Sequence, residues 1–404
     1  MKFEELGLSK DLLGTIQKLG FETPTLVQEK SIPLIIAGKD VIAQSSTGSG
    51  KTLAFGCGIV EQVTPRAGLQ ALVLTPTREL AEQVRGVLHE ISPHKNLNII
   101  SIYGGVSINP QIHALSRADV VVGTPGRLLD HLDRRTIITS KIKILVLDEA
   151  DRMFDMGFID DVQKIIATCP KDRQTLFFSA TISSQVRDLG RRHMRNQQEV
   201  SASKQVDPSK LKQVYYDIPK NQKLSLLVHL LNQERSGLVI VFCNTRRSTD
   251  FLVKNLKANK VNTIAIHGGL SQNQRTNTMR LFNDAKVGVL VCTDVASRGL
   301  HIDNVSHVYN FDLPNDPTDY VHRIGRTARA GEDGKVINLL SDVDYEKFSR
   351  ILKEHRSLGI TKEENPPLES VIAFRPEERR RGRFSGRSPM EHGRRNFRGR
   401  NDSY

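Results

Sequence analysis

The chain has 404 residues, of which 38% are hydrophobic and 25% charged, and its formal net charge is +13. This length exceeds one ordinary hydrophobic core and favours two domains with an appendage. No run of about eighteen apolar residues occurs, and the first residues lack the basic-then-apolar order of a signal peptide, so we expect a soluble, cytoplasmic protein rather than a membrane or secreted one.

The cysteines and the distribution of charge further narrow the classes of protein to which the chain could belong. The four Cys contain no C-x-x-C pair, which argues against a zinc site and a disulfide framework and favours buried apolar side chains. Residues 375–404 hold ten Arg and four acidic residues, while Trp is absent from the whole chain and aromatic residues make up 5% of it. A basic excess with few aromatics favours a polyanionic partner held by its backbone.

The N-terminal part contains two expected helices. Helical spacing covers residues 3–18, with Ser9 as N-cap, and a second helix starts near Thr25. Phe21 lies in the turn between them, and from the residues alone a core position is favoured for it.

A short apolar strand at residues 41–43 is followed by Ser45-Ser46-Thr47-Gly48-Ser49-Gly50-Lys51-Thr52 and then by a helical pattern. Small residues let backbone N–H groups surround phosphate oxygens, and the helix N-terminus adds a favourable dipole. Lys51 can then reach the β- and γ-phosphates, and Thr52 can join a Mg²⁺ shell. The pattern G-x-x-x-x-G-K-[ST] is met except at Ser45, so nucleotide binding is favoured over a plain Gly-rich turn.

An acidic cluster follows the buried strand predicted at residues 144–147. By themselves, Asp148, Glu149 and Asp151 fit a solvated loop as well as a catalytic site. With a phosphate-binding loop in the same domain, Asp148 is expected to help hold Mg²⁺ and Glu149 to activate water.

Other apolar strands also end in polar clusters. Strands alternating with helices predict a parallel sheet whose ligands bind beyond the carboxyl ends of the strands. In the first half these strands are predicted at residues 71–74, 99–103, 120–122 and 175–178, and in the second half at 238–242, 263–266, 287–291, 305–310 and 336–340.

We divide the chain into a first domain (1–202), a linker (203–212), a second domain (213–362) and a basic tail (363–404), because apolar periodicity stops around Pro208. The second domain has no Gly-Lys-Thr loop. It carries Arg323, Arg326 and Arg329 at a spacing that predicts one helix face, for which a solvated basic surface is the alternative to a functional site.

Six motifs in this order, over about residues 1–360, resemble the DEAD-box RNA helicases of helicase superfamily 2. They are Gln28, the Gly-Lys-Thr loop, Pro-Thr-Arg-Glu-Leu, Asp-Glu-Ala-Asp, Ser-Ala-Thr and His-Arg-x-Gly-Arg-x-x-Arg. The resemblance implies two tandem RecA-like α/β domains joined by a flexible linker. It also implies an RNA-dependent ATPase that unwinds short RNA duplexes and remodels ribonucleoproteins.

The resemblance implies roles for individual residues at the nucleotide. Arg326 and Arg329 would act as arginine fingers with Lys51, Asp148 and Glu149, and His301 replaces the usual Asp that contacts the ribose. The implied ATP and Mg²⁺ contacts are Phe3, Phe21, Gln28, Ser46, Thr47, Gly48, Ser49, Gly50, Lys51, Thr52, Asp148 and His301.

The resemblance also implies coupling and RNA-binding residues. Ser179, Thr181, Asp151, His322 and Arg323 would couple the two sites. Sequence-independent RNA contacts would come from Arg78, Gly105, Thr124, Arg127, Thr245, Gly268, Arg275, Thr293 and Asp294. Protein partners would belong to ribonucleoprotein assembly or decay.

The tail at 363–404 is expected to be disordered, because its Arg/Gly-rich sequence cannot form a core. It would tether RNA, or only improve solubility. For the whole chain, two alternatives to a helicase remain: an ATP-latched RNA clamp or annealing chaperone with little unwinding, and a DNA-acting motor of the same superfamily.

Overall fold

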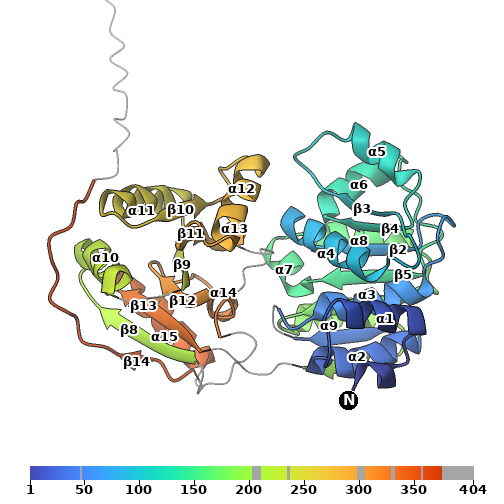
Figure 1. Cartoon of the computed structure of the whole chain (residues 1–404), viewed down its shortest axis with the longest axis horizontal. Coiled ribbons are helices and arrows are strands. Elements are labelled where there is room, and N and C mark those ends of the chain that lie inside the picture. Colours follow the sequence, from blue (N-terminus) through green and yellow to red (C-terminus); the bar gives the residue numbers. More distant parts are fainter. Residues whose placement is uncertain are drawn as a thin grey trace, which may run out of the picture. The chain divides into compact units, whose positions relative to one another are not determined.

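The computed structural model describes residues 1–45, 48–202, 211–233, 237–297, 305–328, 333–355 and 358–374. Residues Met1–Ala373 form one compact unit. Within it, two separate parallel sheets each carry helices on both faces (Figure 1). The expected α/β fold with two tandem RecA-like sheets is confirmed.

The first half contains the first sheet, with strand order β3-β4-β2-β5-β6-β1-β7. Its elements are η1 Phe3–Leu6, α1 Lys10–Lys18, α2 Leu26–Ile36, β1 Val41–Gln44, α3 Lys51–Gln62, β2 Ala71–Leu74, α4 Arg78–Ile91, β3 Ile99–Ile102, α5 Asn109–Leu115, β4 Val120–Gly123, α6 Pro125–Asp133, β5 Ile144–Asp148, α7 Ala150–Asp155, α8 Ile159–Thr168, β6 Gln174–Ser179, α9 Ser184–His193 and β7 Gln198–Ser201.

The second half contains the second sheet, with strand order β10-β11-β9-β12-β13-β8-β14. Its elements are β8 Leu211–Asp217, η2 Lys220–Gln222, α10 Lys223–Gln233, β9 Leu238–Cys243, α11 Arg246–Ala258, β10 Thr263–Ile266, α12 Gln272–Asn283, β11 Val289–Thr293, α13 Asp294–Ser297, β12 Val305–Asn310, α14 Pro317–Ile324, β13 Gly334–Leu340, η3 Asp342–Asp344, α15 Tyr345–Glu354 and β14 Thr361–Lys362.

Strand β5 explains why the first sheet needs helices on both faces. Ile144 and Val146 belong to the apolar core that α1 to α4 cover, whereas Leu145 and Leu147 belong to the core under α6, α8 and α9. Because side chains alternate along a strand, a continuous apolar run must be covered twice. The same run places Asp148 at the covered carboxyl end of the strand.

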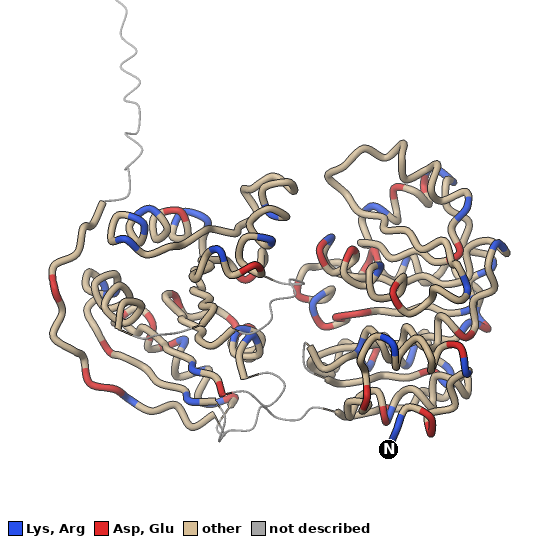
Figure 2. The backbone as a smooth tube through the Cα atoms, viewed as in Figure 1, with Lys and Arg blue, Asp and Glu red and all other residues tan. Residues whose placement is uncertain are grey.

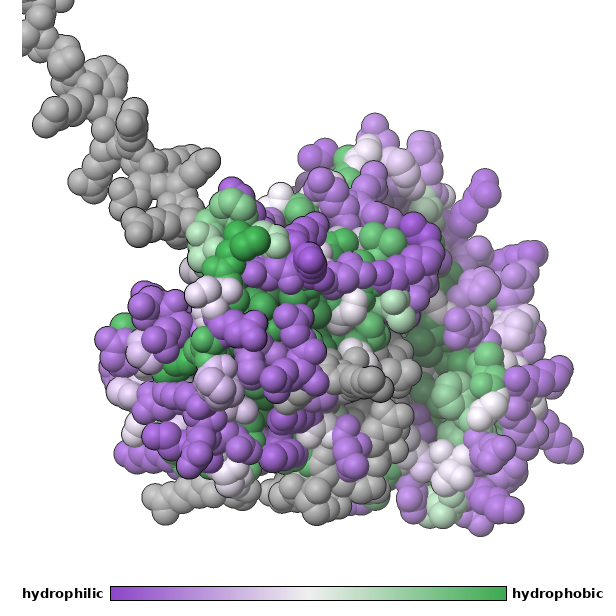
Figure 3. Space-filling view, turned by 60° about the vertical axis from the view of Figure 1, so that its left-hand side comes forward, coloured by the Kyte–Doolittle hydropathy of each residue, from purple (hydrophilic) through white to green (hydrophobic). Residues whose placement is uncertain are grey.

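The apolar side chains are packed in these layers, and the surface is polar. All four cysteines are buried and free, as expected of small apolar side chains. The face drawn in Figure 3 is mostly hydrophilic with smaller apolar patches. Basic and acidic residues alternate along the backbone of both halves (Figure 2), so the described residues of the two halves share no single basic stretch like that at 375–404.

Two domain boundaries differ from the sequence-based division. Strand β8 begins at Leu211, which is buried, inside the segment assigned to the linker. Residues 363–374 were assigned to the tail, but Leu368 and Val371 pack on the second core and Asn259 holds Ile372 by two hydrogen bonds of 2.8 and 3.0 Å. The disorder predicted for residues 375–404 lies outside the described residues.

Candidate functional site: a nucleotide site at the first sheet

The phosphate-binding loop joins β1 to α3, as predicted. Gly50 is the N-cap of α3 with φ 87°, and a Cβ atom there would lie 2.3 Å from Nε2 of Gln28. Glycine is therefore required both by the left-handed backbone and by the close approach. Lys51 is buried and its Nζ donates to the carbonyl of Ser45 at 3.3 Å. Ser46 and Thr47 lie outside the described residues.

Helix α2 holds this loop from one side. The amide of Gln28 accepts a hydrogen bond from Thr25 N at 2.9 Å and donates to the carbonyl of Gly50 at 3.0 Å. Thr25 Oγ1 donates to the carbonyl of Ser49 at 2.7 Å. The amide of Gln28 is thus held at the edge of the phosphate loop by two hydrogen bonds, one with Thr25 at the start of α2 and one with Gly50 in the loop.

The two aromatic residues implied at this site differ in environment. Phe21 is 45% exposed, so the core position favoured from the residues alone is wrong. An exposed ring is available to a planar ligand. Phe3 is buried in the core below α1 and α2.

The acidic loop lies at the end of β5. Asp148 is 2% exposed and, among the described residues, accepts a hydrogen bond from Glu149 N at 3.0 Å. Burial raises the pKa of Asp148 to about 7, Lys51 lowers it, and Glu149 raises it further. Lys51 and Asp148 therefore interact electrostatically, and a cation beside Asp148 would offset the cost of burying its charge.

Glu149 has an unusual backbone. It is the N-cap of α7 with φ 54° and ψ 52°, the left-handed region that costs a non-glycine residue energy. The residue is also 7% exposed. This conformation turns the chain sharply, so that Glu149 is the single residue between the end of β5 and the start of α7.

Asp151 connects the acidic loop to the end of β6. Its backbone N donates to Ser179 Oγ at 3.1 Å, and its Oδ2 accepts from Thr181 N at 2.8 Å and from Thr181 Oγ1 at 3.0 Å. The structure thus brings together three of the residues predicted to couple the sites.

The predicted RNA contacts of the first half lie beyond β2, β3 and β4. The guanidinium of Arg78 occupies the space where a Cβ of Gly105 would lie, at 2.1 Å. Arg127 Nη2 donates to the carbonyl of Val106 at 3.0 Å, and Thr124 is the N-cap of α6. Because these strands are parallel to β5, these residues share the sheet edge with the nucleotide site.

In the second half, Arg323 forms the centre of a buried network. It is 1% exposed, and its guanidinium pairs with both carboxylate oxygens of Asp294 at 2.6 and 2.7 Å. It also donates to the side chains of Asn310 and Asn244 and to the carbonyl of Asp312. Asp294, predicted to contact RNA, is engaged by this arginine.

The prediction that three arginines share one helix face is wrong. Helix α14 ends at Ile324, and Gly325 is its C-cap, so Arg326 lies in the turn after the helix. The following Thr327 donates to the carbonyl of Val305, which directs the chain back to β12. Arg329 and His301 lie outside the described residues.

Several contacts within the compact unit join side chains of the two sheets' loops. Arg152 pairs with Asp319 at 2.8 Å, Glu79 pairs with Arg275 at 3.1 Å, and His322 Nε2 is 4.0 Å from Asp151 Oδ2. Burial lowers the pKa of Arg326, and the charge of Glu149 raises it.

The remaining predicted residues lie at the carboxyl edge of the second sheet. Thr245 is the N-cap of α11, Thr293 ends β11, and Gly268 follows β10. A Cβ at Gly268 would lie 3.0 Å from Nη2 of Arg246. Arg246 thus repeats the packing of Arg78 on Gly105, and the parallel between Thr77-Arg78 and Thr245-Arg246 in the sequence is a signal that our sequence interpretation missed.

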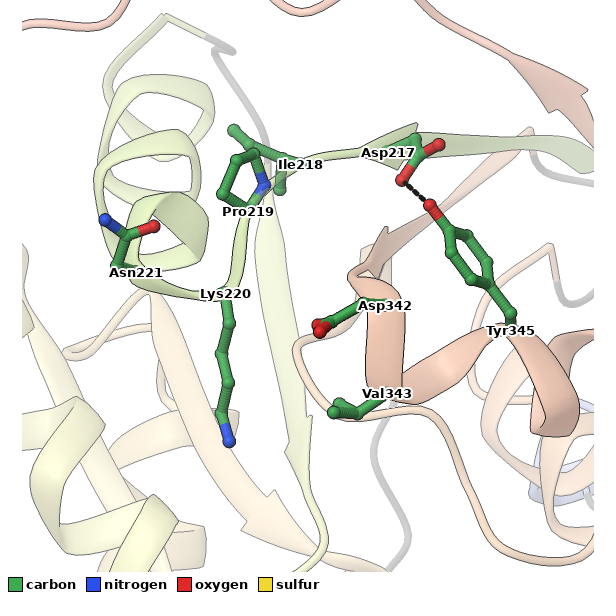
Figure 4. Close-up of a pocket in the computed structure, with 8 residues that line it drawn as sticks. All are labelled: Asp217, Ile218, Pro219, Lys220, Asn221, Asp342, Val343 and Tyr345. Atoms are coloured by element: carbon green, nitrogen blue, oxygen red, sulfur yellow. Dashed lines mark hydrogen bonds between the residues drawn. The ribbon is translucent and has the colours of Figure 1, made fainter.

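A cavity of about 790 Å³ lies elsewhere in the second half (Figure 4). It opens at the end of β8, where Asp217 accepts a hydrogen bond from Tyr345 at 2.7 Å. None of the predicted nucleotide residues lines it, so it is separate from the site described above. Among the described residues, no group of three His, Cys, Asp or Glu side chains is placed to hold a metal ion.

Comparison with known proteins agrees with this geometry. The DEAD/DEAH box helicase family matches residues 25–189, and the helicase conserved C-terminal domain matches residues 222–331. The DEAD-box ATP-dependent RNA helicase CshA of Bacillus subtilis is 41% identical over 373 residues, which are 92% of this chain and 75% of the relative. The chain belongs to the DEAD/DEAH box helicase family. It is therefore an ATP-hydrolysing enzyme.

Solved structures of this family are similar over most of the helicase. Dbp5 of S. cerevisiae bound to RNA and ADP BeF3 is 34% identical, with a TM-score of 0.82 over 90% of this chain and 95% of that one. Mss116 bound to ssRNA and UDP-BeF is 29% identical, with a TM-score of 0.81 over 90% and 79% of the two chains. Within the described residues, no helix combines the length and apolar character needed to cross a membrane.

Proposed function

We propose that this helicase is an ATP-dependent RNA helicase that separates short RNA duplexes without sequence preference. The observation that carries the proposal is that Lys51, at the start of α3, and Asp148, at the end of β5, lie at the same carboxyl edge of a parallel sheet, where the charge of Lys51 lowers the pKa of Asp148. This edge is where such sheets bind ligands. Among the similar proteins, Dbp5 of S. cerevisiae is bound to RNA and ADP BeF3, and CshA of Bacillus subtilis is named an ATP-dependent RNA helicase.

ATP would be held by residues already grouped around the phosphate loop. Backbone N–H groups of 46–50 and the N-terminus of α3 would bind the phosphates, with Lys51 on the β- and γ-phosphates. Phe21 would stack on the base, and the amide of Gln28 would read its edge once its contacts with Thr25 and Gly50 are adjusted.

Mg²⁺ would be held by Asp148, partly through water, and by Thr52. The donor set fits: within the described residues the buried carboxylate accepts one hydrogen bond, which leaves lone pairs for a cation, and oxygen ligands suit this ion. The ion would neutralise charge on the phosphates.

Hydrolysis would use Glu149 to orient and deprotonate the attacking water. Arg326 and Arg329 would stabilise the charge that develops on the γ-phosphate, a role worth roughly 10³ to 10⁵ in rate in other phosphoryl-transfer enzymes. The influence of Glu149 on Arg326 supports this assignment.

RNA would lie along the other loops of the same edges. Contacts would come from Arg78, Gly105, Thr124, Arg127, Thr245, Gly268, Arg275, Thr293 and Asp294. Ser179, Thr181, Asp151, His322 and Arg323 would relay nucleotide state to these loops. We further propose a cytoplasmic location, a tail that tethers RNA, and partners in ribonucleoprotein assembly or decay.

The test is ATP hydrolysis with and without a short RNA or the matching DNA, for the wild type and for Glu149→Gln. We expect stimulation by RNA only, and loss of hydrolysis with retained ATP binding in the variant. Equal stimulation by DNA would favour a DNA-acting motor, and hydrolysis unaffected by the substitution would overturn the assignment of Glu149. RNA binding with ATP but without strand separation would favour the latched clamp.

A further inference from the structure

A second cavity, of about 450 Å³, lies at the opposite edge of the first sheet. Its lining residues include Gly38, Lys143 and Arg173, which precede β1, β5 and β6 respectively. Since these strands are parallel, the cavity is at their amino ends, whereas Asp148 and the phosphate loop are at their carboxyl ends. It is therefore separate from the nucleotide site.

The lining of this cavity is strongly basic. Four cationic side chains contribute to it, and Asp172 is the single carboxylate among the lining residues that the structure describes. The complete lining is Gly38, Gln62, Ser140, Lys141, Ile142, Lys143, Pro170, Asp172, Arg173, Gln174 and Arg195. Cations brought together from three separate loops repel one another unless an anion lies between them.

Arg173 distinguishes this cavity from an ordinary basic surface. It is 6% exposed, and its Nη1 donates to the carbonyl of Pro170 at 2.6 Å, but its buried Nε has no hydrogen-bond partner among the described residues. A buried guanidinium usually satisfies its donors, because an unpaired charged donor costs more than a neutral one. The Nε itself is closed off from solvent, so the group of Arg173 left to bind an anion in the cavity is Nη2, for which the described residues show no hydrogen bond.

The nearest internal counter-charge is already engaged. Asp40 is buried and accepts from Thr175 N at 2.7 Å through one oxygen and from Arg195 N at 2.6 Å through the other. Its charge acts on Arg173, against the effect of burial, but no hydrogen bond joins the two side chains in the described part of the chain. Together with Asp172 in the lining, Asp40 gives two carboxylates against four cations, so the cavity keeps an excess of positive charge.

The same contacts hold the cavity in shape. Arg195 Nη2 donates to the carbonyls of Asp172 and Arg173 at 2.6 and 3.2 Å, which fixes the turn that carries Arg173. Lys141 Nζ lies 3.4 Å from the carbonyl of Ala67, while Lys143 is exposed at the mouth. A buried planar guanidinium together with two exposed ammonium groups suits a tetrahedral oxyanion.

We propose that this cavity is a binding site for a phosphate group carried by a small free anion, such as inorganic phosphate or pyrophosphate. The volume accommodates an ion of this size with its water. The phosphodiester backbone of RNA carries the same chemistry, so the experiment must distinguish a free ion from the polymer.

The test uses isothermal titration of the full chain with inorganic phosphate and, separately, with pyrophosphate. It is done in a Lys51→Ala background, so that the phosphate loop contributes little to the heat. Lys141→Gln/Lys143→Gln removes two exposed charges from the rim, and Lys10→Gln/Lys18→Gln, on α1, removes two exposed charges elsewhere in the first half.

We expect one anion per chain, with a dissociation constant that rises by about tenfold in Lys141→Gln/Lys143→Gln and changes by less than about twofold in the control. Arg173→Lys, with unchanged circular dichroism, should also weaken binding, because it keeps the charge but loses the planar fork. No binding in the Lys51→Ala background, or equal weakening in both double variants, would overturn the proposal. The proposal would also be overturned if the variants lost affinity for a short RNA oligonucleotide alone, because that result would assign the site to the RNA backbone.

Discussion

At the scale of single residues, the nucleotide site contains groups in energetically unfavourable surroundings or backbone conformations. Asp148 is buried and accepts one hydrogen bond from the part of the chain that the structure describes, and Glu149 and Gly50 have positive φ angles. These features cost stability in the free protein, and they are tolerated where ligand binding compensates.

Asp148 makes the stability of the metal-free protein depend on pH. Its pKa is about 7 in the folded chain against 3.8 for an ordinary Asp, so its contribution to stability is fully present below about pH 4 and is lost as pH rises through about 7. Asp148→Asn should therefore stabilise the protein in EDTA, by about 2 kcal/mol more at about pH 8.5 than at about pH 5.5. Urea unfolding at both pH values measures this, and an equal gain at both would contradict it.

Gly50 should tolerate no side chain. Gly50→Ala forces a left-handed residue into Nε2 of Gln28, so we expect ATP affinity to fall by about tenfold or more. Gly86→Ala is the control: it lies in α4 with open space around its Cα, and it should raise stability by roughly 0.5–1 kcal/mol without changing ATP affinity. Fluorescence titration with a labelled nucleotide would decide, and unchanged affinity in Gly50→Ala would refute the argument.

At the scale of elements, the second half depends on one arginine that joins the carboxyl ends of its strands. Arg323, from α14, contacts side chains that follow β9 and β11 and one at the end of β12. It also lies over the ring of Phe242, 4.9 Å from its centroid. The positions of several predicted functional loops thus share one support.

Arg323→Lys should lower the free energy of unfolding of the protein by about 2–4 kcal/mol, because an ammonium group cannot reach all of the acceptors and leaves some buried and unpaired. Arg280→Lys, an exposed position on α12, should change stability by less than about 0.5 kcal/mol. Denaturant unfolding monitored by circular dichroism measures both. Similar stability of the two variants would show that the network contributes little.

The sequence predicted the elements with the strongest apolar signal and missed those without it. The central strands were found because they are buried on both faces, as β5 is. Strands β7, β8 and β14 were missed, since Gln198–Ser201 and Leu211–Asp217 mix apolar with polar residues and Thr361–Lys362 is very short. The prediction that three arginines share one helix face failed because α14 ends before Gly325.

The candidate site was predictable to the extent that it follows from topology. Parallel strands bring their carboxyl ends together, so the grouping of Lys51, Asp148 and Ser179 was foreseeable. The left-handed backbone of Glu149, the exposure of Phe21 and the full engagement of Arg323 were not, because each depends on tertiary contacts that no local pattern records.

At the scale of the whole molecule, ion pairs that join loops of the first sheet to loops of the second sheet matter for coupling between the two halves. Arg152 directly follows the acidic cluster, and Asp319 lies one turn before Arg323 on α14. Both side chains are mostly buried, at 4% and 19% exposed, so their interaction is screened less than that of a surface pair.

Reversing either charge should reduce RNA-stimulated hydrolysis by about tenfold, because a buried charge then loses its partner. Arg152→Asp combined with Asp319→Arg should recover a large part of that loss, whereas pairing Arg152→Asp with an Arg at exposed Asp316 should not. Steady-state ATPase kinetics with saturating RNA provide the measurement. Additive losses in the double reversal would contradict a direct role for this pair.

The most direct test of the central claim is strand separation of a short RNA duplex with ATP, measured by native gel or fluorescence for the wild type and Glu149→Gln. We predict separation by the wild type that requires ATP, no multiple-turnover separation by the variant, and no activity on the matching DNA duplex. Absence of separation by a wild type that hydrolyses ATP in the presence of RNA, or separation independent of ATP, would contradict the account.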